Sequence, residues 1–298
     1  MRIVTNPGSN LDEELAHRLD VDVLPQKIVV DGISHDTRNT IDFAQVDAWV
    51  QRAQKHPHVL GTSEVDFVED FERLIRKDPD VLCIMTSRKI IGSHDAALAA
   101  TRALRSHANP VLSGARVEVV DTMVTDVGAG LITLAAVQAR KEGLDPVRSA
   151  IALRRMAERG HCIMGVATLD NLIRGGRASF LQGWVANFFN VRPLLAFIDG
   201  SVTSVGRVSS KSDLPEKMDE YLATRLEKGT RVWVGIAHGN APDKAERFLA
   251  KLRERYVVEF ALVRPLSASI YLHAGPGSVL SFVYPLAGLP LKLVPPSA

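Results

Sequence analysis

The chain has 298 residues, 46% hydrophobic and 23% charged, which is typical of a globular protein with one large or two medium-sized cores. Its 36 basic and 34 acidic residues nearly balance, which argues against a nucleic-acid partner or an anionic membrane surface. The two cysteines, Cys83 and Cys162, lie in separate hydrophobic runs without neighbouring ligand pairs. They predict reduced core thiols rather than a disulfide or a metal site.

Neither a secretion signal nor a membrane span is apparent in the sequence. Residues 1–6 lead directly into a strand pattern and lack the apolar region and cleavage site of a signal peptide. No uninterrupted apolar run reaches the roughly 18–20 residues that cross a bilayer. We therefore expect a soluble, cytoplasmic protein without stable membrane insertion.

Strand and helix patterns alternate along the first half of the chain. Residues 81–85 form a continuous apolar run, as in parallel strands covered on both faces. Asp145 followed by Pro146 marks a helix start, with the aspartate as N-cap. The predicted strands are 2–5, 27–30, 81–85 and 117–120, and the predicted helices are 11–19, 42–54, 65–77, 93–107, 123–141 and 146–159.

The second half adds a hairpin to this alternation. Asp199-Gly200 is a strong two-residue turn signal, and it predicts antiparallel pairing of 194–198 with 201–208. The other predicted strands are 162–167, 232–237, 257–263 and 279–284, and the predicted helices are 181–189, 213–227 and 243–256.

The repeated alternation predicts an α/β protein with two α/β domains. Residues 1–160 are expected to form a purely parallel sheet with helices on both faces. Residues 161–286 are expected to form a mixed sheet with helices, and residues 287–298 a frayed, Pro-rich tail.

Polar loops lie where ligands bind in open α/β sheets. The carboxyl ends of parallel strands share one edge of the sheet, and hydroxyls with free N–H groups at helix starts favour anions. The loops are 5–10, 61–64, 86–93 and 121–122. N-capping explains each loop singly, whereas their shared edge favours a joint site.

Familiar enzyme motifs are missing, because the sequence has no G-x-x-x-x-G-K-[ST], G-x-S-x-G or H-E-x-x-H. Two side chains beside glycine turns remain. Arg177 follows Gly175-Gly176 and offers paired donors to a carboxylate or phosphate, and His273 precedes a Gly-Pro-Gly turn. The aromatic-rich segment 180–189 is either a core helix or a ligand wall. An anion clamp beside bulky apolar residues suggests a ligand with an acidic head and an apolar body.

Six motifs in order resemble the DegV family of bacterial fatty-acid-binding proteins, which includes the FakB subunits of fatty acid kinase. The resemblance runs from residue 1 to about 285. The motifs are Ile3-Val4-Thr5-Asn6 through Leu11, Gly61-Thr62-Ser63, Thr86-Ser87 through Gly92-Ser93, Leu172-Ile173-Arg174-Gly175-Gly176-Arg177, Asn190-Val191-Arg192-Pro193-Leu194, and His273-Ala274-Gly275-Pro276-Gly277.

This resemblance implies a lipid-binding protein rather than an enzyme. The second domain would bury the chain of one long-chain fatty acid, and its carboxylate would lie at the domain junction. No cofactor and no metal are implied. Arg177 and His273 would assist a separate kinase subunit that makes an acyl phosphate. The implied head-group residues are Thr62, Gly92, Ser93, Arg177 and His273.

Three positions depart from the family pattern: Asn6 replaces an aspartate, Ile91 a head-group serine and Asp95 a glutamine. Because Ile91 has no hydrogen-bonding side chain, Ser93 or the Gly92 N–H would take its place. Alternatively, the ligand is a bulkier or less acidic lipid.

Two other functions remain open. The first is a stand-alone acyl or phosphoryl enzyme, with His273 as general base and Arg177 as oxyanion or phosphate clamp. The second is a regulatory protein whose ligand only signals occupancy.

Overall fold

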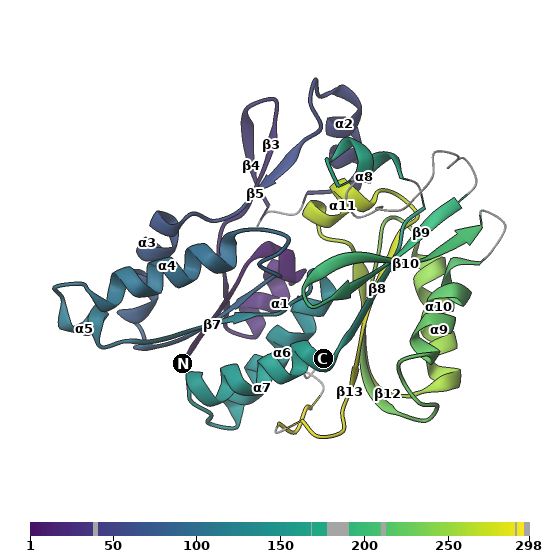
Figure 1. Ribbon diagram of the computed structural model, residues 1–298. Helices are drawn as coiled ribbons and strands as arrows, with labels where there is room; N and C mark the ends of the chain where they lie inside the picture. The colour runs from purple at the N-terminus through teal and green to yellow at the C-terminus, as the bar shows by residue number, and fades with distance from the viewer. Residues whose placement is uncertain (38–40, 168, 178–190, 210–212, 290, 295–298) are drawn as a thin grey trace.

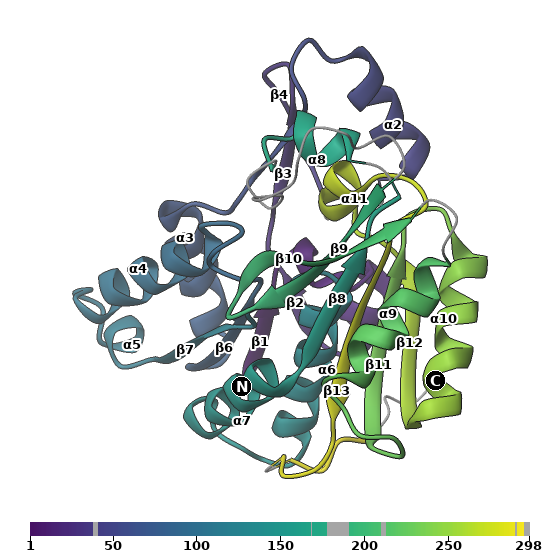
Figure 2. The same cartoon turned by 45° about the vertical axis from the view of Figure 1, so that its right-hand side comes forward.

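A computed structural model describes residues 1–37, 41–167, 169–177, 191–209, 213–289 and 291–294. They form an α/β structure with two main sheets and a small third sheet (Figures 1 and 2). In this part of the chain, no helix is long and apolar enough to cross a membrane.

The first main sheet is entirely parallel and has the strand order β2-β1-β6-β7. Its helices cover both faces, as expected, and alternate residues of β6 explain why: Leu82 and Ile84 join one core, while Val81 and Cys83 join the other. The strands are β1 (Arg2–Thr5), β2 (Val21–Val23), β6 (Asp80–Met85) and β7 (Arg116–Asp121), and the helices are α1 (Glu13–Arg18), α3 (Glu64–Ile75), α4 (Ser93–Arg105), α5 (Pro110–Ser113), α6 (Val127–Lys141) and α7 (Pro146–Arg159).

A three-stranded antiparallel sheet corrects the expectation of a purely parallel first half. Its order is β4-β3-β5, and it stands with α2 (Phe43–Arg52) at the top of Figure 1. The strands are β3 (Lys27–Val30), β4 (Ile33–Asp36) and β5 (His58–Leu60). Asp31 and Gly32, with φ of 46° and 86°, form the two-residue turn that joins β3 to β4. This Asp-Gly pair is a hairpin signal that the sequence analysis did not use.

The second main sheet is mixed and has the order β10-β9-β8-β13-β11-β12. The expected hairpin is confirmed, since β9 and β10 pair antiparallel around Asp199 and Gly200. Helices α9 (Leu214–Ala223) and α10 (Pro242–Arg255) cover one face. The strands are β8 (His161–Gly165), β9 (Val191–Ile198), β10 (Ser201–Ser209), β11 (Arg231–His238), β12 (Val257–Pro265) and β13 (Val279–Pro285). The predicted helix at 181–189 lies outside the described residues.

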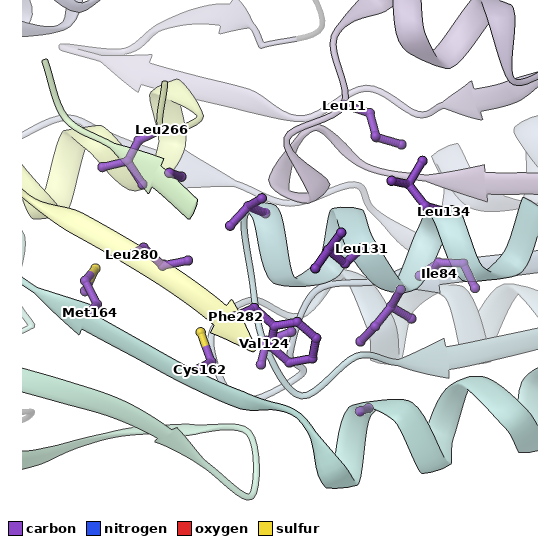
Figure 3. Close-up of a cluster of buried hydrophobic side chains, with 14 of the residues drawn as sticks. Leu11, Ile84, Val124, Leu131, Leu134, Cys162, Met164, Leu266, Leu280 and Phe282 are labelled. Carbon is purple, nitrogen blue, oxygen red and sulfur yellow. The ribbon is translucent and has the colours of Figure 1, made fainter. Parts of the chain in front are cut away.

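Helices α6 and α7 lie between the two main sheets, so one core joins them. Figure 3 shows Leu131 and Leu134 of α6 in the cluster that also contains Ile84 of the first sheet and Phe282 of the second. Because β8 begins at His161, directly after α7, we propose a domain boundary near residue 160. Leu291 is 5% exposed and packs on α6 and α7, so this part of the tail does not fray.

Candidate functional site

A cavity of about 330 Å³ lies between the loops at the end of the first sheet and the second sheet. Small-molecule sites usually start near this size, at roughly 300 Å³. Segments far apart in the sequence contribute its walls. The lining residues are Gly8, Gln26, Val59, Thr86, Lys89, Ile90, Ile91, Thr125, Met164, Leu172, Gly176, Arg177, Phe197, Val202, Ser269, Ile270, His273, Ala274 and Leu280.

Arg177 reaches this cavity from the turn that ends α8 (Asp170–Arg174). Gly176 has a φ of +73°, which glycine adopts without strain, and the Arg177 N–H donates to the Leu172 carbonyl (2.8 Å). The guanidinium folds back, and its Nη1 donates to the Gly175 carbonyl (2.7 Å). Burial lowers the pKa of Arg177. No acidic residue among those described forms an ion pair with it, so its charge is open to an anionic ligand.

His273 lies near the end of α11 (Ala268–Ala274), a helix that the sequence analysis missed. The helix ends at Gly275, which has a φ of +71°, and the following turn is fixed by the Gly277 N–H, which donates to the Gly239 carbonyl (2.6 Å). Burial chiefly, with the nearby charge of Arg177, lowers the pKa of His273 to about 3. The imidazole is therefore neutral at pH 7, and neither ring nitrogen has a hydrogen-bond partner in the described chain.

The charge and polarity of the cavity suit an anion with an apolar tail. None of the described residues that line it is acidic, whereas Arg177 and Lys89 are cationic. Apolar side chains from α8 and the second sheet form another part of the lining: Met164, Leu172, Phe197, Val202 and Leu280. An acidic head and an apolar body both find matching surfaces here.

A larger groove, of about 810 Å³, opens elsewhere, beside α1 and the ends of β11 and β12. Four acidic residues line it: Asp12, Glu13, Asp22 and Asp42. Its arginine, Arg264, is already paired with Asp12. The acidic lining makes this groove a poorer anion site than the smaller cavity, despite its size.

Arg177 and His273 share the cavity, but Thr62, Gly92 and Ser93 are not among its lining residues. Thr62 follows Gly61 in one loop, and Gly92 and Ser93 follow Ile91 in another. The two loops lie against each other, since a Cβ on Gly61 would stand 2.5 Å from Ser93 Oγ and 3.0 Å from Ile91 Cγ1. Ile91 itself lines the cavity.

One of the two hydroxyls in these loops already donates a hydrogen bond within the protein, and the other is buried. Thr62 Oγ1 donates to the Pro25 carbonyl (2.5 Å). Ser93 is 1% exposed, and its Oγ has no hydrogen-bond partner in the described chain. The family-implied contacts of Thr62, Gly92 and Ser93 with a carboxylate therefore stay predictions.

Sequence reasoning missed several polar lining residues, notably Gln26 and Ser269. Thr86 and Lys89 lie in a loop that was singled out for its polarity, without a role of their own. Asn6, which replaces the family's aspartate, donates through Nδ2 to Thr86 Oγ1 (3.4 Å). No local pattern marked Gln26, which lines the cavity together with residues of β5 and of the loop after β6.

A family model described as uncharacterised proteins of the DegV family matches residues 1–285. The chain belongs to the DegV family. Among curated relatives, a DegV domain-containing protein of Caldanaerobacter subterraneus is 26% identical over 276 residues, covering 92% of this chain and 95% of that protein. One from Mycobacterium tuberculosis is 27% identical, covering 93% and 94%.

The solved structures agree with the fold. A DegV family protein from Thermus thermophilus, described by its fatty acid binding, matches with a TM-score of 0.85 and 27% identity, over 96% of this chain and 100% of that one. DegV, a fatty acid binding protein from Bacillus subtilis, matches with a TM-score of 0.79 and 20% identity, over 95% and 98%. The second likeness concerns the fold alone.

Proposed function

We propose that this DegV protein binds one long-chain fatty acid and presents it to a separate kinase subunit for acyl phosphate formation. The observation that carries the proposal is a single cavity lined by an arginine, a neutral histidine and apolar side chains. Among the described residues, the arginine has no acidic partner and the histidine ring has no hydrogen-bond partner. The fatty acid binding described for the Thermus thermophilus relative supports the same ligand class.

In this proposal the acyl chain lies among Met164, Leu172, Phe197 and Leu280. Burying a chain of this kind contributes about 0.8 kcal/mol per CH₂ group. The carboxylate lies near Arg177, whose charge compensates for its desolvation. His273 donates a hydrogen bond from its neutral ring without adding a second full charge.

Acyl phosphate formation needs ATP, which the proposal assigns to the partner. A carboxylate oxygen of the fatty acid attacks the γ-phosphorus, the bond from that phosphorus to ADP breaks, and acyl phosphate and ADP are released. Arg177 and His273 would stabilise the charge that develops on the transferred group.

The buried histidine favours a carrier over a stand-alone enzyme. A general base works best when its pKa lies near the working pH, and the pKa of His273 is lowered to about 3. As a base it would be nearly inert at neutral pH.

A kinase-coupled assay tests the proposal. Delipidated protein, a fatty acid kinase catalytic subunit, oleate and ATP should together release ADP, and omitting any one should abolish release. Arg177→Ala and His273→Ala should retain bound oleate but fail to support turnover. Arg174→Ala is the matched control, because Arg174 lies three residues before Arg177, at the end of α8, but donates to the Val50 carbonyl (2.7 Å). Normal turnover by both variants would contradict the assigned roles.

A further inference from the structure

Gln26 is a buried polar residue whose side chain makes no hydrogen bond to the described residues. It lies between β2 and β3 and is 3% exposed. Its backbone is held in place, because its carbonyl accepts from the N–H (2.8 Å) and from Oγ1 (2.9 Å) of Thr37. These two hydrogen bonds fix the backbone from which the Gln26 side chain extends.

The carboxamide of Gln26 has no hydrogen-bond partner in the part of the chain that the structure describes. Oε1 is buried and unpaired, and Nε2 makes no hydrogen bond to any described residue. Nε2 is also absent from the fully buried unpaired atoms, so it keeps some access to open space. Because Gln26 lines the cavity that also holds Arg177 and His273, this amide donor is available to an acceptor atom on a ligand.

Three residues near Gln26, namely Thr62, Ile91 and Val59, do not supply a free hydrogen-bond donor to the cavity. Thr62 Oγ1 already gives its hydrogen to the Pro25 carbonyl (2.5 Å), one residue before Gln26. Ile91 and Val59, which line the cavity nearby in the fold, carry no hydrogen-bonding side chain.

We propose that the Gln26 carboxamide binds the ligand's carboxylate by donating a hydrogen bond from Nε2. Gln26 thereby selects lipids that end in an ionised acid over esters of the same length. An amide N–H recognises a charged oxygen more strongly than a neutral one, because charge-assisted hydrogen bonds are the stronger kind. This inference rests on the proposed fatty acid function, which it extends to head-group selectivity.

The test compares two ligands of equal length, oleate and methyl oleate, on the delipidated full chain. Gln26→Leu should weaken oleate binding about ten-fold or more and leave methyl oleate within about two-fold of the wild type. Gln26→Glu keeps the shape and places a second anion beside the carboxylate, so it should weaken oleate binding further at pH 8. Val59→Ala is the matched control on the same wall, and it should weaken both ligands equally because it removes only apolar contact.

The outcomes distinguish the role of Gln26 from fatty acid binding itself. Selective loss of oleate binding in Gln26→Leu supports the inference, and so does the same result in Gln26→Met, which also removes the donor without adding charge, where the leucine variant does not fold. Unchanged oleate binding, or equal loss of both ligands, overturns it and leaves the proposed function standing. A wild-type chain that binds neither ligand overturns the proposed function itself.

Discussion

The backbone of Gly175 lies directly against the imidazole of His273: a Cβ at residue 175 would stand 2.6 Å from His273 Nδ1. This contact joins the turn after α8 to the end of α11. It sets the position of the ring that Arg177 also approaches, since Arg177 donates to the Gly175 carbonyl. Two motifs almost a hundred residues apart thus come together at one cavity, because Gly175 has no side chain to displace the ring.

A Gly175→Ala substitution tests this contact. The added methyl must displace His273 or the turn, so we expect a loss of about 1–3 kcal/mol in the free energy of unfolding and weaker oleate binding. Gly206→Ala is the matched control, because a Cβ at residue 206 would make only ordinary contacts, 3.6 Å from Leu194 Cβ. Thermal unfolding and oleate titration of both variants check the prediction. Equal behaviour of the two variants would contradict it.

The second prediction concerns stability at acid pH. The pKa of His273 in the folded chain, lowered to about 3, lies below its ordinary value of 6.5. The unfolded chain therefore takes up a proton first, and stability held above pH 6.5 is lost as the pH falls toward 3. The loss from this group approaches about 1.4 kcal/mol per pH unit. Urea unfolding from pH 7 to pH 4 should show a shallower decline in His273→Asn than in the wild type, and parallel curves would disprove the assignment.

The hydroxyl of Thr62 gives a third prediction. Because it donates to the Pro25 carbonyl, Thr62→Val should lower the free energy of unfolding by about 1 kcal/mol. If this bond is the main role of the hydroxyl, oleate affinity should fall less than about three-fold, whereas the carboxylate contact that the family resemblance implies would give a larger loss. Thr101→Val is the control, since it breaks a similar buried bond, to the Ala97 carbonyl (2.9 Å), on α4. A ten-fold loss for oleate but not for methyl oleate would instead assign Thr62 a direct contact with the carboxylate.

A fourth prediction addresses the join between the two main sheets. Asp126 is fully buried before α6, and it accepts from Asn10 Nδ2 (2.7 Å) and from the N–H (2.9 Å) and Oγ (2.7 Å) of Ser267. Asp126→Asn places an amide donor against these donors, and we expect a loss of about 2 kcal/mol or more. Asp243→Asn, at an exposed position, should change stability by less than about 0.5 kcal/mol. Chemical denaturation of both variants decides, and similar midpoints would contradict the prediction.

Much of the fold could be predicted from local patterns. The apolar run at 81–85 and the Asp199-Gly200 turn each have a physical cause that acts within a few residues, and both became the elements they indicated. Strands β2 and β5, of three residues each, and the seven-residue helix α11 are too short for periodicity to reveal.

The site could be predicted only in part. Glycine turns marked Arg177 and His273, because such turns leave a trace in the sequence. No sequence pattern marks Gln26, because its place in the cavity depends on how segments about 30 to 65 residues away pack beside it. Ile91 could be seen to lack a hydroxyl, but which residue compensates for it is a matter of tertiary structure.

The central claim, that the cavity holds one long-chain fatty acid, is tested most directly by native mass spectrometry of the purified full chain. We predict one acyl chain per protein, released by denaturation with the mass of a free fatty acid, and stoichiometric uptake of oleate after delipidation. A chain that carries no acyl species and takes up none on incubation with oleate would contradict the account.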